Sequence, residues 1–98
     1  MSKQPNILFI MTDQQRSDTI HALGNQEIRT PVLDSLVREG TTFTNCYTPA
    51  PVCVAGRSAT ITGTPPHQNG CTSNGASPMH LQSIMQVLQE QGYYTHGI

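Results

Sequence analysis

The chain has 98 residues, of which 11% are charged and 36% hydrophobic, and its formal net charge is -1 at pH 7. Ordinary soluble domains carry about 25% charged residues, so this composition predicts a segment of a larger protein rather than a separately solvated domain. The scattered Lys and Arg residues exclude an electrostatic surface for nucleic acid, and no apolar run reaches the roughly 18 residues of a membrane span.

The first predicted element is the apolar run over residues 6–12, close to the beginning of the chain. Its pattern is continuous rather than alternating, which is typical of a strand in the centre of a parallel sheet. The run is too short for the core of a signal peptide. We therefore expect a cytoplasmic protein without a membrane partner.

Two further elements follow with clear boundary signals. Thr30 and Pro31 predict the start of a helix, with Thr30 as its N-cap and Pro31 in the first helical position, and Gly40 predicts its end. Residues 41–47 alternate and are rich in Thr, Phe and Tyr, which predicts a second strand.

The second half of the chain is predicted to form two helices and the beginning of a third strand. A short helix over residues 54–62 ends at Gly63. Residues 64–78 form a long loop, of the kind that is usually functional. Residues 77–78 open a last helix that ends at Gly92, and residues 93–98 begin a strand. This order predicts an α/β fold, a sheet with flanking helices.

Asp13 and Gln14 are candidate metal ligands, because they follow the first predicted strand directly. Open α/β sheets bind ligands at the edge where their strands end. A carboxylate beside an amide carbonyl offers hard oxygen donors that suit Ca²⁺ or Mg²⁺. The same dipeptide is also common in loops that bind nothing.

Cys53 and Arg57 are candidate catalytic residues. A cysteine at the start of a helix lies where backbone N–H groups and the helix dipole stabilise negative charge. Arg57 follows four residues later, one turn along the same face, and its guanidinium suits a tetrahedral oxyanion. Taken singly, the two residues are also consistent with a structural cysteine and a surface arginine.

Together these segments resemble the N-terminal part of the type I sulfatases, the formylglycine-dependent, arylsulfatase-like family of the alkaline phosphatase superfamily. Residues 6–15 resemble the opening strand with its metal pair, residues 30–47 the following helix and strand, and residues 53–63 the sulfatase signature. The resemblance implies the α/β sheet of that superfamily. Residues 1–98 would then be the N-terminal part of a catalytic domain that is incomplete at its C-terminal end.

The resemblance also implies a mechanism. A maturase would oxidise Cys53 to formylglycine, whose hydrate would attack the sulfur of a sulfate ester of a small molecule or a sugar. Asp13, Gln14 and residue 53 would bind a divalent cation, with Ca²⁺ as the first candidate and Mg²⁺ or Mn²⁺ as alternatives. Arg57 would hold the hydrate and balance the developing charge.

The signature departs from its commonest form at two positions, because Ala55 and Gly56 stand where Pro and Ser are usual. This form resembles substrates of the oxygen-independent maturases. The family's remaining metal ligands and its catalytic Lys and His are expected beyond Ile98. We therefore expect the 98-residue chain alone to be inactive and to self-associate through exposed sheet edges.

Two other functions stay open. Asn74 resembles an Asn of the phosphonate monoester hydrolases that contacts the substrate oxyanion, and with Gln14 it favours phosphonate or phosphate ester hydrolysis on the same scaffold. Asn74 beside Gly75 is equally typical of a turn. A non-catalytic zinc site, which lacks the close cysteine pair of known structural sites, would use four residues: Cys46, Cys53, His67 and Cys71.

Overall fold

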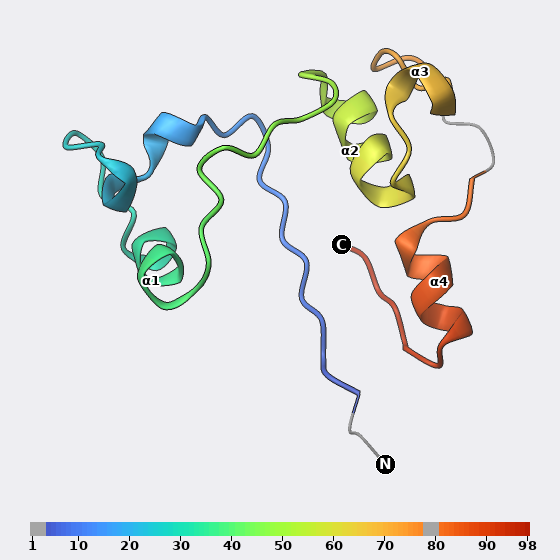
Figure 1. The fold of residues 1–98 in the computed structure, drawn as a ribbon, viewed down its shortest axis with the longest axis horizontal. Helices are drawn as coiled ribbons and strands as arrows, with labels where there is room; N and C mark the ends of the chain where they lie inside the picture. The colour runs from blue at the N-terminus through green and yellow to red at the C-terminus, as the bar shows by residue number, and fades with distance from the viewer. Residues whose placement is uncertain (1–3, 78–80) are drawn as a thin grey trace. The chain divides into compact units, whose positions relative to one another are not determined.

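The computed structural model describes residues 4–77 and 81–98, and it divides into two compact units, Met1–Thr44 and Asn45–Ile98. The first unit contains the 3₁₀ helices η1 (Ser17–Thr19) and η2 (His21–Leu23) and the helix α1 (Pro31–Glu39) (Figure 1). The second contains α2 (Cys53–Thr62), α3 (Pro66–Asn69) and α4 (Ile84–Glu90). Within the described ranges, no helix has the length and apolar character needed to cross a bilayer.

Helix α1 begins and ends where its boundary residues predict. Thr30 precedes the helix, Pro31 is its first residue, and the backbone N–H of Gly40 donates to the Leu36 carbonyl at 2.9 Å. Proline suits the first turn because the N–H that it lacks has no partner inside the helix. The predicted helix over this segment is confirmed.

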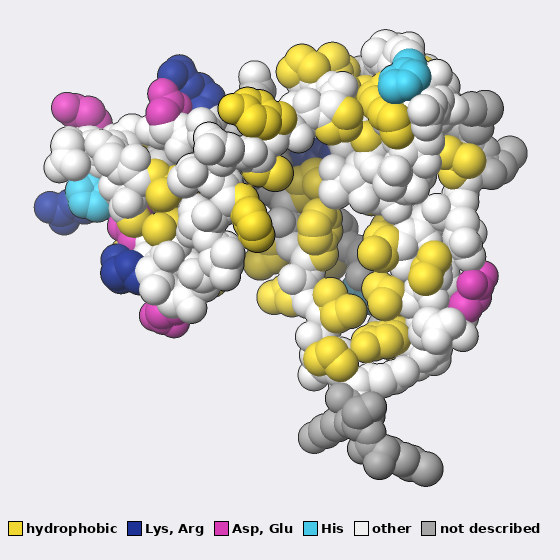
Figure 2. All heavy atoms as spheres, in the orientation of Figure 1, with side chains coloured by type: hydrophobic (Ala, Val, Ile, Leu, Met, Phe, Trp, Pro, Cys, Tyr) yellow, Lys and Arg dark blue, Asp and Glu magenta, His cyan; other side chains and the backbone are white. Residues whose placement is uncertain are grey.

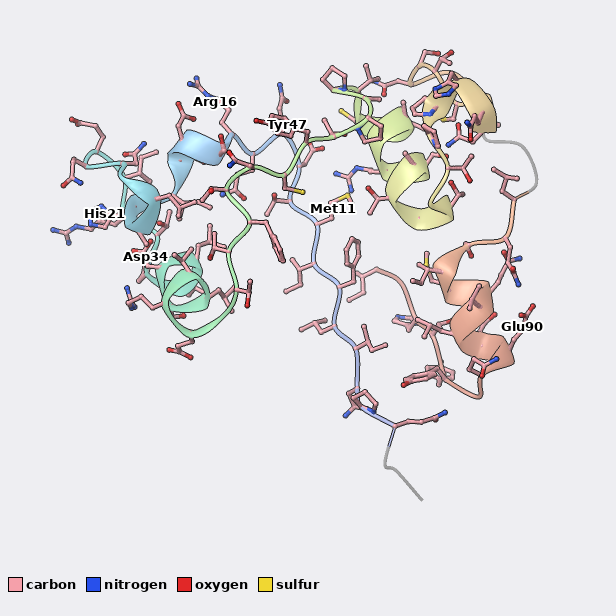
Figure 3. The ribbon with its side chains drawn as sticks, in the orientation of Figure 1. Met11, Arg16, His21, Asp34, Tyr47 and Glu90 are labelled. Carbon is pink, nitrogen blue, oxygen red and sulfur yellow. The ribbon has the colours of Figure 1, made fainter. Side chains whose placement is uncertain are left out.

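The Thr30 hydroxyl joins α1 to η2 instead of capping its own helix. It accepts a hydrogen bond from the His21 backbone N–H at 2.9 Å and donates one to the Asp34 carboxylate at 2.8 Å. The same carboxylate accepts from the Ala22 backbone N–H at 2.9 Å. His21 and Asp34 are labelled on these two elements in Figure 3. Two polar side chains therefore fix η2 against the start of α1.

Asp34 is buried, and its environment favours the charged carboxylate. Burial alone raises the pKa of this carboxyl, but the hydrogen bonds from Ala22 and Thr30 and the positive charges of His21 and Arg38 outweigh it. The net effect holds the pKa of Asp34 below its ordinary value of 3.8. The contact between η2 and α1 therefore depends on an ionised side chain.

Helix α2 confirms the helix predicted over residues 54–62, with one residue more at its start. It begins at Cys53 and ends at Gly63, whose φ of 66° lies in the left-handed region that glycine adopts without a steric penalty. Its buried residues are small: Ala55, Ser58 and Ala59. Helix α2 packs against α3 and also contacts α4.

The predicted long loop contains the short helix α3, which begins after Pro65 and ends at Gly70. The last helix also differs from the prediction, and the proposed start at residue 78 lies outside the described residues. Helix α4 follows Ser83, whose hydroxyl accepts from the Gln86 N–H while the Gln86 side chain accepts from the Ser83 N–H. This reciprocal pair satisfies two N–H groups and fixes the helix start.

None of the expected strands over residues 6–12, 41–47 and 93–98 forms in the part of the chain that the structure describes, so the α/β sheet is not confirmed. The apolar side chains of the first segment are exposed, including Leu8 at 85% and Phe9 at 65%. Figure 2 shows hydrophobic side chains at the surface of the molecule. A strand requires a neighbour for its backbone N–H and C=O groups, and a side-chain pattern does not report whether that neighbour is present.

Candidate functional site

Cys53 is the first residue of α2, and its side chain is exposed. The residue before it, Val52, has an extended backbone with φ -127° and ψ 131° and a side chain without hydrogen-bonding groups. The first N–H groups of a helix have no partner within it and carry the positive end of the helix dipole. A negatively charged oxygen or sulfur at position 53 would therefore lie in a favourable field.

Asn74 supplies the cap that Val52 does not. Its side-chain oxygen accepts a hydrogen bond from the Val54 backbone N–H at 3.1 Å, across 20 residues of sequence. The structure thereby brings Asn74 to the same helix end as Cys53. The contact uses only the oxygen of the amide, so its NH₂ group stays a donor for a ligand at this end of the helix.

Arg57 is half-buried and lies on α2 four residues after Cys53. Because residues i and i+4 lie on the same face of an α-helix, one turn apart, the guanidinium is carried on the face that also carries Cys53. The helical spacing predicted for this pair is confirmed. The positive charge of Arg57 and the N-terminus of α2, on the face that carries Cys53, both favour the binding of an anion.

The packing around the start of α2 explains why a glycine occupies position 56. A Cβ added at Gly56 would lie 2.9 Å from the Ala50 carbonyl oxygen and 3.4 Å from the Thr48 hydroxyl. The Thr48 hydroxyl donates to that same carbonyl at 2.8 Å and fixes the turn before α2. Gly56 therefore lets this turn lie directly on the first turn of the helix, next to Cys53.

A buried polar cluster, which the sequence analysis did not identify, holds α2 and α3 together. Asn69 is fully buried, and its side-chain NH₂ donates to the Ser58 hydroxyl at 3.2 Å and to the Thr64 carbonyl at 2.8 Å. Its side-chain oxygen accepts from the Cys71 N–H at 2.8 Å. The one sequence signal is the Asn69-Gly70 pair, which is also typical of an ordinary turn.

Asp13 and Gln14 belong to the first unit, whereas Cys53, Arg57 and Asn74 belong to the second. Gln14 has φ 49°, the only positive φ at a non-glycine residue among those described. Such a backbone is uncommon for a residue with a Cβ, and it occurs often at ligand-binding sites. The carboxylate and amide oxygens of this pair fit a hard divalent cation.

The zinc alternative gains no support from the structure. Among the described residues, no three His, Cys, Asp or Glu side chains come close enough together to hold a metal ion. Cys46 and Cys53 are exposed, while Cys71 is buried, and its thiol faces the Ala76 carbonyl at 3.5 Å. The buried Cys71 thiol therefore makes its contact inside the second unit.

Comparison with known proteins matches residues 5–98 to the family model described as Sulfatase. The chain is 37% identical over 97 residues to an arylsulfatase of Clostridium perfringens, which covers 97% of this chain and 20% of that protein. It is 35% identical over 95 residues to an N-acetylglucosamine-6-O-sulfatase of Bacteroides thetaiotaomicron, covering 96% of the chain and 17% of that protein.

A mammalian relative has a similar degree of identity. Arylsulfatase A of Bos taurus is 34% identical over 98 residues, which cover 93% of this chain and 19% of the bovine protein. The chain therefore spans about a fifth of the length of the relatives that it matches. No solved structure matches the chain significantly.

Proposed function

The chain belongs to the sulfatase family, and from that premise we propose that it supplies the nucleophile of an enzyme that hydrolyses sulfate monoesters. The single observation that carries the proposal is the position of Cys53 as the exposed first residue of α2. Arg57 follows one turn later, and Asn74 contacts the same helix end. This end of the helix combines a reactive side chain with groups that stabilise an anion.

Cys53 is proposed to be oxidised by a maturase before the enzyme is active. Conversion of the CH₂SH side chain to an aldehyde removes two electrons and two protons, which pass to the maturase, while water supplies the aldehyde oxygen and the sulfur leaves as H₂S. Exposure of the Cys53 side chain supports this step, because a modifying enzyme needs access to it. The aldehyde would supply, as its hydrate, the oxygen that attacks the sulfur of the ester.

Arg57 and Asn74 are proposed to act on the anionic groups of the reaction. The Arg57 guanidinium would donate to the sulfate oxygens, which carry the charge that must be stabilised in the transition state. The Asn74 oxygen is occupied by the Val54 N–H, so the side chain would turn its NH₂ group to a sulfate oxygen. Both residues would orient the ester without being consumed.

Asp13 and Gln14 are proposed as ligands of a divalent cation, with Ca²⁺ first and Mg²⁺ or Mn²⁺ as alternatives, and the family resemblance adds residue 53. When bound, the cation would lower the pKa of the attacking hydroxyl. Ca²⁺ takes about six to eight oxygen ligands, so Asp13 and Gln14 would supply only part of the set. We therefore propose that the 98-residue chain alone does not turn over a sulfate ester.

The test of the proposed function is the mass of the tryptic peptide that contains residue 53, from protein produced with a formylglycine-generating maturase. We expect the peptide to be lighter than the cysteine form, because the side chain loses the atoms of H₂S and gains one oxygen atom. The same preparation of the complete enzyme should release sulfate from an aryl sulfate, and a Cys53→Ala variant should not. An unmodified thiol in a preparation that still releases sulfate would contradict the proposal.

A second candidate function, hydrolysis of phosphonate or phosphate esters on the same scaffold, is favoured by the contact between Asn74 and Val54. That contact holds Asn74 at the helix end that begins with residue 53, which supports the resemblance of Asn74 to the Asn of the phosphonate monoester hydrolases. Assays of sulfate, phosphonate and phosphate esters with one aryl leaving group would separate the candidates. The larger kcat/KM identifies the substrate class.

A further inference from the structure

Asn69 and Asn74 are connected by hydrogen bonds and by the short chain segment 71–74, in a series that starts and ends on α2. The series begins at the Ser58 hydroxyl, which accepts from the Asn69 side chain at 3.2 Å. It continues through the Cys71 backbone N–H, which donates to the Asn69 oxygen at 2.8 Å. It ends where the Asn74 oxygen accepts from the Val54 N–H at 3.1 Å. Val54 and Ser58 lie one turn apart on the same helix.

The segment between Cys71 and Asn74 is held at both of its ends. Cys71 is fully buried, and its thiol contacts the Ala76 carbonyl at 3.5 Å. The Ala76 backbone N–H also donates to the Ser73 carbonyl at 3.2 Å. Asn74 lies between these contacts in an exposed turn, so its position is set by the anchors on either side of it. Residues 71–76, which we term the Asn74 loop, are therefore fixed to α2 through Asn69.

We propose that Asn69 is a positioning residue of the active site, which acts through the Asn74 loop on the helix end that carries residue 53. Asn69 is fully buried, so its side chain offers no exposed surface to a substrate. Its hydrogen bonds to Ser58, Thr64 and Cys71 fix the start of the Asn74 loop, and Asn74 in turn caps α2 next to the nucleophile. This inference rests on the proposed function, because it assigns residue 53 to the reaction.

The first test measures hydrogen exchange at the Val54 amide by NMR, without reference to catalysis. Asn74→Ala removes the acceptor, so exchange at this amide should rise roughly tenfold. Asn69→Ala should raise it to a similar extent, and the double variant should not exceed the larger single effect. Gln68→Ala changes the exposed neighbour on α3 and should leave this amide unchanged.

Ser58→Ala keeps the test decisive if Asn69→Ala does not fold. It removes only the acceptor on α2 and leaves the bonds from Asn69 to Thr64 and Cys71 in place. We expect a several-fold rise in exchange at the Val54 amide in this variant. A folded Ser58→Ala or Asn69→Ala protein with unchanged exchange at Val54, relative to the other α2 amides, would overturn the proposal.

The second test uses the complete enzyme and an aryl sulfate. Asn69→Ala should lower kcat by roughly tenfold to a hundredfold with KM nearly unchanged, as expected for a displaced catalytic end rather than a lost binding contact. Equal losses in Asn69→Ala, Asn74→Ala and the double variant support the coupling, whereas multiplying losses contradict it. If Val54 exchange responds as expected but no sulfate is released by the unsubstituted enzyme, the proposed function fails separately.

Discussion

The side-chain oxygen of Asn74 lies 3.1 Å from the backbone nitrogen of Val54 and accepts its hydrogen bond. It accepts the kind of hydrogen bond that a Ser, Thr, Asp or Asn side chain at the N-cap position usually accepts. Asn74, however, lies in a loop 20 residues away in sequence. The start of α2 is therefore defined by tertiary contact rather than by its own flanking residue, Val52.

The first prediction concerns this cap. Asn74→Ala should lower the free energy of unfolding of the second unit by about 1 kcal/mol, the usual cost of removing an N-cap side chain. Asn74→Asp keeps the acceptor and adds a negative charge at the positive end of the helix, so it should be at least as stable as the unsubstituted chain. Urea denaturation followed by far-UV circular dichroism measures both, with Thr72→Ala as the exposed control. Equal destabilisation by Ala and Asp would contradict the capping role.

The second prediction concerns the close approach at Gly56. Gly56→Ala should destabilise the second unit by about 1–3 kcal/mol, because its Cβ would lie 2.9 Å from the Ala50 carbonyl. This is the net loss, after the roughly 1 kcal/mol by which alanine improves helix propensity has been subtracted. Gly75→Ala is the matched control, since a Cβ there meets no described atom within 4 Å. Unfolding midpoints of the two variants check the difference, and a Gly56→Ala chain that is more stable would show that the turn moves freely.

The third prediction concerns pH and Asp34. Its folded pKa is below the ordinary value of 3.8, so its contribution to stability is complete above the unfolded pKa and is lost as the pH falls through the folded value. The contact between η2 and α1 should therefore weaken on acidification below about pH 4. The NMR shift of the Ala22 amide, which donates to Asp34, reports this transition.

A neutral side chain at position 34 provides the control. Asp34→Asn keeps an oxygen acceptor but does not titrate, so the acid transition at the Ala22 amide should disappear. Glu27→Gln removes an exposed carboxylate elsewhere in the first unit and should leave the transition in place. Persistence of the transition in Asp34→Asn would assign it to another group.

Local signals in the sequence predict both ends of α1 and the end of α2. Pro31 begins α1, Gly40 follows its last residue, and Gly63 follows the last residue of α2. These residues act through their own backbone geometry, so they need no distant partner. Helix α4 begins at Ile84, later than the sequence analysis predicts, because the capping box of Ser83 and Gln86 fixes its start. Such signals act within one turn of chain.

Features that depend on distant partners could not be predicted in this way. Residues 6–12, with their apolar run 7–11, satisfy the pattern of a buried strand, but the described chain provides no neighbouring strand for their backbone groups. The role of Asn69 was missed for a related reason: its partners Ser58 and Thr64 come from other segments, and no spacing rule connects them. The pairing of Asn74 with Val54 likewise appears only in three dimensions. Side-chain chemistry and family resemblance identify the candidate residues, whereas only the fold determines their contacts.

The fourth prediction concerns Asp13 as a cation ligand. In the complete enzyme, Asp13→Ala should reduce the Ca²⁺ retained after dialysis, because a carboxylate is the stronger of the two proposed oxygen donors. Asp18→Ala removes a nearby carboxylate that is already paired with Arg16 and should leave the Ca²⁺ content unchanged. Metal analysis by atomic emission measures both. Equal Ca²⁺ in the two variants would remove Asp13 from the site.

The last prediction separates the backbone of Gln14 from its side chain. A residue with a Cβ at φ 49° bears a steric cost of about 1–2 kcal/mol, which Gln14→Gly relieves, although glycine adds roughly 0.5–1 kcal/mol of unfolded-state entropy. Gln15→Gly incurs the entropy without the relief, since Gln15 does not have a positive φ. Gln14→Gly should therefore be the more stable variant, by about 1 kcal/mol in urea denaturation of the chain.

Ca²⁺ binding by the complete enzyme should rank the same two variants in the opposite order. Gln14→Gly removes a proposed ligand, whereas Gln15→Gly removes a neighbouring amide of the same size that has no proposed contact with the cation. A titration with Ca²⁺ should then give weaker binding for Gln14→Gly alone. If Gln14→Gly is the more stable variant but binds Ca²⁺ more weakly than Gln15→Gly, the unfavourable backbone conformation of Gln14 is needed to present its side chain to the cation. If both measurements favour Gln14→Gly, the strained conformation has no connection to the cation, and Gln14 is an ordinary loop residue.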